Sequence, residues 1–393
     1  MVRRKRRSSH PTGPDEAWRS YCRHPDTMIP GNDVELLVDG EKAYEAMLRA
    51  MGEAQQFILM DSYIFNDDFA GRIFSEALQT SAKRGIEVYL VVDGVGTLHV
   101  PRLFFEVLER AGVRVLVYRS PAPWRRSFGI LRRNHRKMLI VDGYVGFLGG
   151  INIGDEWLPK AYGGKGWHDI HAKVAGPVVR DMTRLAISTW HVHRGIVLDS
   201  KKFLPPVAPM GTIYAAIAGS RERKKRKVIR HSYLKAIRQA TEYIYIANAY
   251  FLPDLGFRRA LKNACRRGVD VRVMVPKRGD IFSVQLASQS LYRRLMRMGV
   301  KIYLWKEAVL HAKCAVIDDQ WATVGSYNID HRSWTMNLEV NLNAMGPSLA
   351  SHLKSVFLHD QERCESLEIE TWRKRPLFLK FLERIVAIFR QWM

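Results

Sequence analysis

The chain carries one set of reactive residue types twice, at identical spacing. Each set has a histidine, a lysine two residues later, an aspartate seven residues after the histidine and an asparagine seventeen residues after it. The two sets are His135, Lys137, Asp142 and Asn152, and then His311, Lys313, Asp318 and Asn328. One such set is a weak signal. Two in the same register predict two halves of one site, in which both histidines act.

Two histidines and two lysines suit the cleavage and transfer of a phosphodiester. One neutral imidazole can attack phosphorus and form a phosphohistidine, while a protonated imidazole gives its proton to the leaving oxygen and later accepts one from the incoming hydroxyl. The lysines would neutralise the non-bridging oxygens, and Asn152 and Asn328 would donate hydrogen bonds to them. Because the lysines supply positive charge, we expect neither a metal nor a cofactor. Asp142 and Asp318 follow apolar strands at turns, so we expect them to position the motifs.

A histidine that exchanges protons needs a partner on its second ring nitrogen, which holds the ring in one tautomer. Asp169 and Glu339 are the candidates, because each lies seven residues before a Gly-Pro pair in its own half. We expect each carboxylate to support the histidine of its own motif.

Apolar runs and helical stretches alternate in the same order in both halves of the chain. The expected strands are 57–60, 86–92 and 113–118, and then 243–246, 269–275 and 300–305. The expected helices, each followed by a glycine, are about 70–84, 103–111, 255–267 and 291–298. This alternation predicts a duplicated domain of α/β units with a largely parallel, buried sheet.

Length and composition are those of a globular protein with two domains. The chain has 393 residues, and an apolar content of 47% is enough for buried cores. Its four cysteines are scattered without zinc, redox or disulfide spacing, which favours a reducing compartment. No stretch resembles a signal peptide, and no window reaches the length of about 18 uncharged apolar residues that a transmembrane helix needs.

The net charge of +23 is concentrated in runs. Such a field attracts polyanions, and both nucleic acid and anionic lipid qualify. The runs are Arg3–Arg7, Arg125–Arg133, Arg221–Arg230 and Arg373–Arg375.

The doubled motif resembles the signature of the phospholipase D superfamily. Within it, the chain is similar to bacterial cardiolipin synthases from about Val34 to about Cys364, and resembles the shorter type that lacks N-terminal transmembrane helices. The segments that carry this resemblance are Asn134–Asn152, Asn248–Pro253 and Trp321–Asp330.

The resemblance implies two tandem phospholipase D-like α/β domains related by a pseudo-twofold axis, with the active site at their interface. It implies that two phosphatidylglycerols are joined into cardiolipin with release of glycerol. His135 would be the nucleophile and His311 the acid and base. The expected partners are anionic phospholipids, with phosphatidylethanolamine as a further candidate, and a membrane surface; nucleic acid is not expected. The expected location is the cytoplasmic face of a bacterial inner membrane, as a peripheral protein.

The expected boundaries follow the proline-rich stretch near Pro205 and the basic runs. They are a basic flexible tail over 1–28, a first domain over 29–204, a linker with a basic segment over 205–228, a second domain over 229–365 and a basic amphipathic C-terminal helix over 366–393.

The last seventeen residues, Leu377–Met393, suit a helix that lies at a membrane interface. Lys380, Glu383, Arg384, Arg390 and Gln391 share one face, and a wide apolar face lies opposite. A closing helix packed on the second domain is the alternative. For the chain as a whole, the alternatives are a lipid hydrolase, a nuclease of the same superfamily and a non-catalytic nucleic-acid-binding module. The last leaves the repeated histidines without a purpose.

Overall fold

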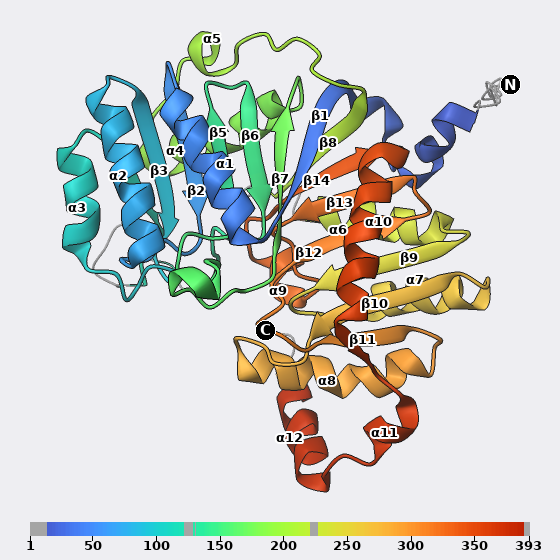
Figure 1. Ribbon diagram of the computed structural model, residues 1–393. Helices are drawn as coiled ribbons and strands as arrows, with labels where there is room; N and C mark the ends of the chain where they lie inside the picture. The colour runs from blue at the N-terminus through green and yellow to red at the C-terminus, as the bar shows by residue number, and fades with distance from the viewer. Residues whose placement is uncertain (1–13, 122–128, 130, 221–226, 389–393) are drawn as a thin grey trace, which may run out of the picture.

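The computed structural model describes residues 14–121, 129, 131–220 and 227–388 (Figure 1). The predicted basic runs at Arg3–Arg7 and at Arg125 and Arg126, most of the run that begins at Arg221, and the end of the predicted C-terminal helix from Phe389 onward lie outside these residues.

One mixed sheet of fifteen strands runs through both halves of the chain. Its order is β15-β11-β10-β9-β12-β13-β14-β8-β1-β7-β6-β5-β2-β3-β4, so each half repeats the same arrangement outward from the antiparallel pair β1 and β8. This repetition is the pseudo-twofold relation expected of a duplicated domain. The strands of the first half are β1 (Ile29–Val38), β2 (Phe57–Ser62), β3 (Glu87–Asp93), β4 (Arg114–Tyr118), β5 (Met138–Val141), β6 (Val145–Gly149) and β7 (Ile170–Ala175). Those of the second half are β8 (Ile213–Gly219), β9 (Tyr243–Asn248), β10 (Asp270–Pro276), β11 (Lys301–Trp305), β12 (Lys313–Ile317), β13 (Trp321–Gly325), β14 (Val340–Met345) and β15 (Cys364–Ser366).

The expectation of a largely parallel sheet is wrong. Among the described strands, only β2-β3-β4 and β9-β10-β11 pair in parallel. The strands that carry the motifs, β5 and β12, form antiparallel hairpins with β6 and β13. A tight turn of a few residues can join only antiparallel neighbours, because a parallel pair needs a long crossover.

Helices cover both faces of each half of the sheet (Figure 1). In the first half, α1, α2 and α3 pack on one face and α4 on the other; in the second, α6, α7 and α8 lie opposite α10. Helix α4 also contacts β8, and α10 contacts β1, so each of these two helices joins the halves. The helices are α1 (Asp39–Glu53), α2 (Phe69–Lys83), α3 (Arg102–Arg110), α4 (Val179–Arg194), α5 (Ser200–Phe203), α6 (Val228–Gln239), α7 (Leu255–Arg266), α8 (Phe282–Met296), α9 (His331–Thr335), α10 (Pro347–Glu362), α11 (Ile369–Arg373) and α12 (Leu377–Ile388).

Two boundaries differ from the expectation. The predicted linker over 205–228 contains β8, a central strand that pairs with β1 on one side and β14 on the other. Its short run of small apolar residues, Ile213–Gly219, carries little strand signal, and it is the two neighbouring strands that place it in the sheet. The helix expected over 291–298 begins earlier, at Phe282.

The segment from Pro14 to Met28, expected as part of a flexible tail, is packed against the second half. It forms two short 3-10 helices, η1 (Pro14–Tyr21) and η2 (Pro25–Thr27). Trp18 and Tyr21 are buried beside α6, and the Tyr21 hydroxyl donates to Asp318 Oδ2 at 2.7 Å. Burial of these two aromatic side chains offsets the loss of chain entropy.

The single helix expected over 366–393 is replaced, within the described residues, by two helices, α11 and α12, which follow the second half and project below it in Figure 1. Helix α12 packs along α8, and the buried side chain of Trp372 in α11 contacts the ring of Tyr292 in α8. Within the described residues, no helix is both long enough and apolar enough to cross a membrane.

Candidate active site

The two motifs lie at equivalent positions and span the hairpin strands β5 and β12, with each histidine just before its strand. Each is tied to the other half of the molecule by backbone hydrogen bonds. His135 N donates to Leu338 O at 2.9 Å, and His311 N donates to His168 O at 2.7 Å. The two histidines therefore precede their strands and are held against chain segments of the opposite half.

The carboxylates support the histidines in a crossed arrangement. Glu339 Oε2 of the second half lies 3.0 Å from His135 Nδ1, and Asp169 Oδ2 of the first half lies 2.7 Å from His311 Nδ1. The expectation that each carboxylate supports the histidine of its own motif is wrong. The segments that carry Asp169 and Glu339 lead into β7 and β14, and each passes the motif of the other half before its strand begins.

The environments of the two histidines favour neutral rings in the unliganded protein. Burial is the largest cause that lowers the pKa of His135, to about 4, and it outweighs the opposing charge of Glu339. Burial and the neighbouring Lys313 likewise lower the pKa of His311. The pKa of Asp169 is lowered although burial would raise it, because Lys313 and His311 stabilise its charge. Asp169 is therefore an anion that can hold a proton on His311 Nδ1.

Both lysines are directed toward the histidine of their own motif. Lys137 Nζ donates to His135 O at 2.8 Å, and Lys313 Nζ lies 2.9 Å from His311 Nδ1. Burial lowers the pKa of each ammonium group, and the repulsion between the two lysines adds to this for Lys137. Carboxylates near the site, Asp169 and Glu339 among them, oppose this effect on both lysines, and an entering phosphodiester anion would stabilise their charged forms further.

The two asparagines end the hairpins that the motifs begin, and both are buried. Asn152 Oδ1 accepts from Ile64 N at 3.1 Å, which anchors this side chain beneath the loop after β2. The Asn328 amide oxygen is buried without a hydrogen-bond partner among the described residues. Their expected donation to substrate oxygens remains a prediction.

Asp142 and Asp318 lie at the far ends of β5 and β12 from the histidines. The Asp142 carboxylate accepts three backbone N–H groups, from Gln55, Gln56 and Phe57, each at 2.8 Å. Asp318 accepts from the corresponding segment, including Tyr243 N at 2.7 Å. This geometry supports the positioning role, because each carboxylate anchors the start of the strand that lies beside its motif.

Three aromatic side chains of the site were not identified from the sequence. The Tyr63 ring lies 5.1 Å from the ring of His135 and 5.2 Å from Lys137 Nζ. The rings of Trp157 and Trp167 lie 5.3 and 5.6 Å from that of His311. The one available signal was the Trp167-His168-Asp169 sequence, which places a tryptophan two residues before the carboxylate.

The residues next to the carboxylates differ between the halves. Ser326 Oγ donates to Glu339 Oε2 at 2.5 Å. Its counterpart in the first half is Gly150, where an added Cβ would lie 2.1 Å from Asp169 Oδ1. Trp157 Nε1 donates to Asp169 instead, at 3.1 Å. The Asp169 carboxylate thus lies close to the backbone at position 150, and only a glycine at that position leaves room for it.

His168, which the sequence left without a role, is held between two carboxylates at the interface of the halves. Its Nδ1 lies 2.7 Å from Asp39 Oδ1 and its Nε2 2.8 Å from Asp360 Oδ2. Burial would lower the pKa of this imidazole, but its hydrogen bonds to Asp360 and Asp39 raise it to about 10. Its ring also stacks on Trp305 at 4.5 Å. The equivalent residue of the second half is Leu338. A protonated imidazole therefore lies next to the backbone of His311, and an apolar leucine takes the same place next to His135.

Some of the predicted basic run is structural. Arg133 is buried, and its guanidinium lies 3.3 Å from Asp93 Oδ1 and donates to Arg119 O at 2.9 Å. Arg136 is also buried and donates to Thr189 Oγ1 at 3.0 Å. These cations hold the loop before β5 and are not part of a surface for a polyanion. Within the described part of the chain, no three His, Cys, Asp or Glu side chains are grouped as metal ligands.

Comparison with known proteins agrees with this architecture. The family model described as "Cardiolipin synthase, PLD-like domain" matches residues 47–160 and 233–361. A cardiolipin synthase of Alkalihalophilus pseudofirmus is 33% identical over 355 residues, which cover 90% of this chain and 70% of that protein. Cardiolipin synthase 1 of Staphylococcus epidermidis is 34% identical over 364 residues, which cover 92% of this chain and 74% of that protein.

A solved structure shares the fold over nearly the whole length. The phosphatidylserine synthase of Haemophilus influenzae superposes with a TM-score of 0.69 at 13% sequence identity, covering 92% of this chain and 95% of that one. Fold and doubled site together define an enzyme of the phospholipase D class, with two PLD-like halves. Within this class, the chain belongs to the cardiolipin synthase family.

Proposed function

We propose that this protein is a cardiolipin synthase that transfers the phosphatidyl group of one phosphatidylglycerol to a hydroxyl of a second and releases glycerol. The observation that carries the proposal is the pair of crossed contacts, His135 with Glu339 and His311 with Asp169, in a chain of the cardiolipin synthase family. These contacts bring both motif histidines to one site, which is what a two-step transfer requires.

In the first step, His135 attacks phosphorus of the donor lipid. Glu339 holds Nδ1 of His135, so Nε2 is the nitrogen left to form the bond. With its pKa near 4, the ring is neutral at pH 7 and its lone pair is available. As the N–P bond forms, the bond from phosphorus to the glycerol oxygen breaks, and His311 gives that oxygen its proton. The products are phosphatidyl-His135 and glycerol.

In the second step, His311 is neutral and accepts the proton of a hydroxyl group on a second phosphatidylglycerol. That oxygen attacks phosphorus, the N–P bond breaks, and cardiolipin and free His135 result. Lys137 and Lys313 offset the negative charge on the non-bridging oxygens in both steps. His311 must be protonated at the outset. The phosphodiester anion raises the pKa of this buried ring when it binds, and Asp169 retains the proton on Nδ1.

Product analysis tests the reaction. Purified protein is incubated with vesicles of phosphatidylglycerol, alone and with phosphatidylethanolamine, and the lipids are identified by mass spectrometry. We expect cardiolipin with stoichiometric glycerol, and an acid-labile phosphohistidine in wild type that His135→Ala lacks. His135→Ala and His311→Ala should each lose at least about a thousandfold in turnover. Phosphatidic acid as the sole product, or cleavage of added DNA alone, would contradict the proposal.

We propose that the protein attaches peripherally to the cytoplasmic face of a bacterial inner membrane, and the exposed side chains of α12 support the attachment itself. This helix packs on α8, yet it leaves a stripe of large apolar side chains in solvent. Leu377, Phe378 and Phe381 are 80%, 68% and 60% exposed, and Ile385 of the same stripe is 39% exposed. Glu383, expected on the solvent face, is instead buried. An apolar stripe of this kind is suited to the boundary between head groups and acyl chains.

A chain of contacts links α12 to the site. Val386, near the end of α12, packs with Leu252 and Val284, and Tyr250 joins the same cluster. Tyr250 donates to Asp280, whose charge acts on both His311 and Lys313. Attachment through α12 would therefore bring the membrane close to the reacting groups.

Vesicle co-sedimentation tests the attachment. Phe378→Ser with Phe381→Ser should weaken binding to vesicles that contain phosphatidylglycerol by at least about tenfold, because each exposed aromatic loses about 1–2 kcal/mol of burial in the interface. Val197→Ser with Met210→Ser is the control, since these side chains are 77% and 63% exposed far from α12 in the sequence. Equal binding of the two variants would rule out the stripe as the anchor.

A further inference from the structure

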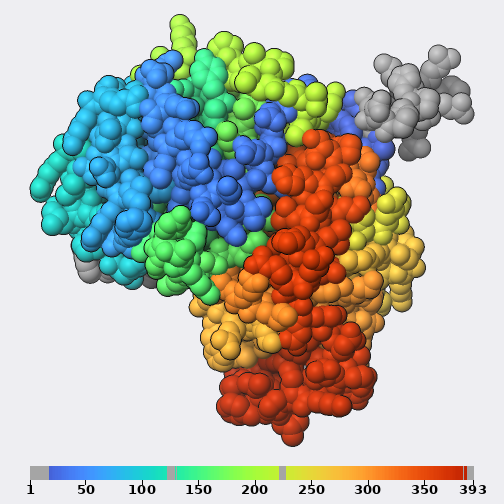
Figure 2. Space-filling view, in the orientation of Figure 1, coloured from blue at the N-terminus to red at the C-terminus, as the bar shows by residue number. Residues whose placement is uncertain are grey.

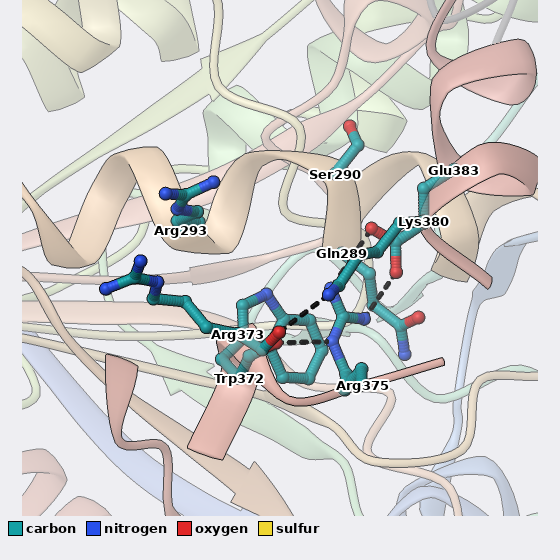
Figure 3. Close-up of a pocket in the computed structure, with 8 residues that line it drawn as sticks. All are labelled: Gln289, Ser290, Arg293, Trp372, Arg373, Arg375, Lys380 and Glu383. Carbon is teal, nitrogen blue, oxygen red and sulfur yellow. Dashed lines mark hydrogen bonds and ion pairs between the residues drawn. The ribbon is translucent and has the colours of Figure 1, made fainter. Parts of the chain in front are cut away.

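We infer that a cationic pocket between α8, α11 and α12 binds the phosphate of an anionic phospholipid head group outside the active site. The pocket has a volume of about 430 Å³ (Figure 3). Four cationic side chains and one carboxylate line it: Arg293, Arg373, Arg375, Lys380 and Glu383. None of these belongs to either motif. The inference rests on the proposed membrane attachment and names the lipid contact that accompanies it.

Only part of the positive charge in this pocket is neutralised. Arg375 forms a close pair with Glu383, whose side chain is 6% exposed, and its guanidinium lies over the ring of Trp372. Lys380 Nζ donates to Arg373 O at 2.6 Å. The carboxylate is thus committed to one arginine, and it holds the start of α12 against α11.

Arg293 and Arg373 remain as the cations available to a ligand. Arg293 forms no ion pair with any residue that the structure describes, and Arg373 has only a distant contact of 3.8 Å with Glu370, where both side chains are more than half exposed. In Figure 3 the two guanidinium groups lie on the same side of the pocket. Paired guanidinium groups suit phosphate, because their N–H groups match its oxygens in pairs.

The position of the pocket next to the apolar stripe identifies the source of the phosphate as a lipid. Lys380 lies three residues after Leu377 and directly before Phe381, so the cationic rim borders the exposed stripe on the helix surface. A phospholipid with its acyl chains along Phe378 and Phe381 would carry its phosphate at the level of the pocket. Free phosphate or glycerophosphate shares the charge but gains nothing from the stripe.

Substitution of the two available arginines tests this inference in the full-length chain. Arg293→Gln with Arg373→Gln should weaken binding to phosphatidylcholine vesicles that contain phosphatidylglycerol by about tenfold or more, and should leave binding to pure phosphatidylcholine vesicles unchanged. Arg259→Gln with Arg266→Gln removes the same charge from exposed positions of α7 and should change binding by less than about twofold. Unfolding curves would establish that all variants are folded.

Two outcomes would overturn the inference. If both double variants weaken binding equally, only the net charge of the protein matters. The second outcome concerns free phosphate. If millimolar glycerophosphate or inorganic phosphate weakens the vesicle binding of the wild-type protein as much as the substitutions Arg293→Gln with Arg373→Gln do, the pocket takes free phosphate. Arg293→Lys with Arg373→Lys should keep part of the binding, because a lysine retains charge without the paired donors. Failure to form cardiolipin would contradict the proposed reaction and leave these binding results intact.

Discussion

At the scale of single residues, each motif histidine has a carboxylate partner and an aromatic neighbour, but the residues that fill these places and the exposed fractions of the two rings differ. His135 is paired with Glu339, faces Tyr63 and is 12% exposed at its side chain. His311 is paired with Asp169, lies against the rings of Trp157 and Trp167 and is 6% exposed. The more accessible ring suits the proposed nucleophile, and the more enclosed ring suits a group that must keep and return a proton.

The pH dependence of the reaction follows from these rings. The proposed mechanism requires neutral His135 and protonated His311. The pKa of His135 is lowered to about 4, and that of His311 is lowered below its usual 6.5. As pH falls toward 4, His135 gains a proton and kcat/KM declines; as pH rises, His311 loses one and kcat/KM declines again. We therefore expect a bell-shaped profile of kcat/KM with its maximum between about pH 4 and 6.5.

The profile of kcat should extend to higher pH, because the bound phosphodiester anion raises the pKa of His311. Initial rates with a soluble short-chain phosphatidylglycerol would give both profiles. A basic limb of kcat/KM above pH 7 would show that His311 is not the required acid.

Asp142 belongs to the same scale and illustrates a motif residue outside the chemistry. We expect Asp142→Ala to lower the free energy of unfolding by about 2–3 kcal/mol, because three backbone N–H groups lose a charged acceptor. The folded fraction should retain most of its turnover number. Urea unfolding and active-site titration would measure the two quantities separately. A stable but inactive variant would contradict the positioning role.

At the scale of elements, the segment before β7 connects the site to the interface between the halves. His168 precedes Asp169 directly, and its carbonyl accepts from His311 N. Asp39, at the junction of β1 and α1, accepts from both His168 Nδ1 and Asp169 N. Asp360 of α10 holds the other side of the imidazole. One protonated ring thus fixes a first-half strand, a second-half helix and the carboxylate behind His311.

We expect His168→Leu, which copies Leu338 of the other half, to destabilise the fold by about 3 kcal/mol at pH 6, because Asp360 is left buried without its partner. The pKa of His168 is raised in the folded state to about 10. Its stabilisation is therefore complete below about pH 6.5 and is lost as pH rises through 10. Thermal unfolding of both proteins from pH 6 to 10 would show the difference shrinking. His168→Leu with Asp360→Leu should recover part of the loss, and a difference that is independent of pH would exclude a charged His168.

At the scale of the whole molecule, the site exists only because the halves exchange residues. Each pair of a motif histidine and a carboxylate takes the histidine from one half and the carboxylate from the other. The pair β1 and β8, together with α4 and α10, holds the halves in one continuous sheet and core. Figure 2 shows the first half, in blue and green, in close contact with the second half, in orange and red. A duplicated domain has thereby become a single catalytic unit.

The crossed arrangement predicts an effect on the opposite half. Asp169→Asn should shift the side-chain nitrogen NMR signals of His311 and leave those of His135 in place, and Glu339→Gln should do the reverse. Each variant should lose about 10²–10⁴-fold in kcat, because a ring without its carboxylate loses its tautomer and the stabilisation of its charge. Perturbation of the histidine in the same half would contradict the structure.

Much of this could be predicted from the sequence, because local patterns carry it. The repeated spacing identified both histidines and both lysines, and the strand and helix pattern located β2, β3, β4 and their counterparts. Asp169 and Glu339 were found by their common distance to Gly-Pro. The segment Pro14–Met28 and the strand β8 were misassigned, since their order comes from contacts with α6, β1 and β14 that no local pattern reports.

The sequence by itself determined which residues are the candidates for the chemistry and that there are two halves. Spacing along a chain reports such features because motif, strand and helix are local. Only the tertiary structure decided which carboxylate supports which histidine, that His168 is charged, and that α12 turns its carboxylate inward and its aromatic side chains outward. Each of these depends on segments that are far apart in the chain and meet across the pseudo-twofold interface or against α8, and their balance of burial and charge exists only once they are packed.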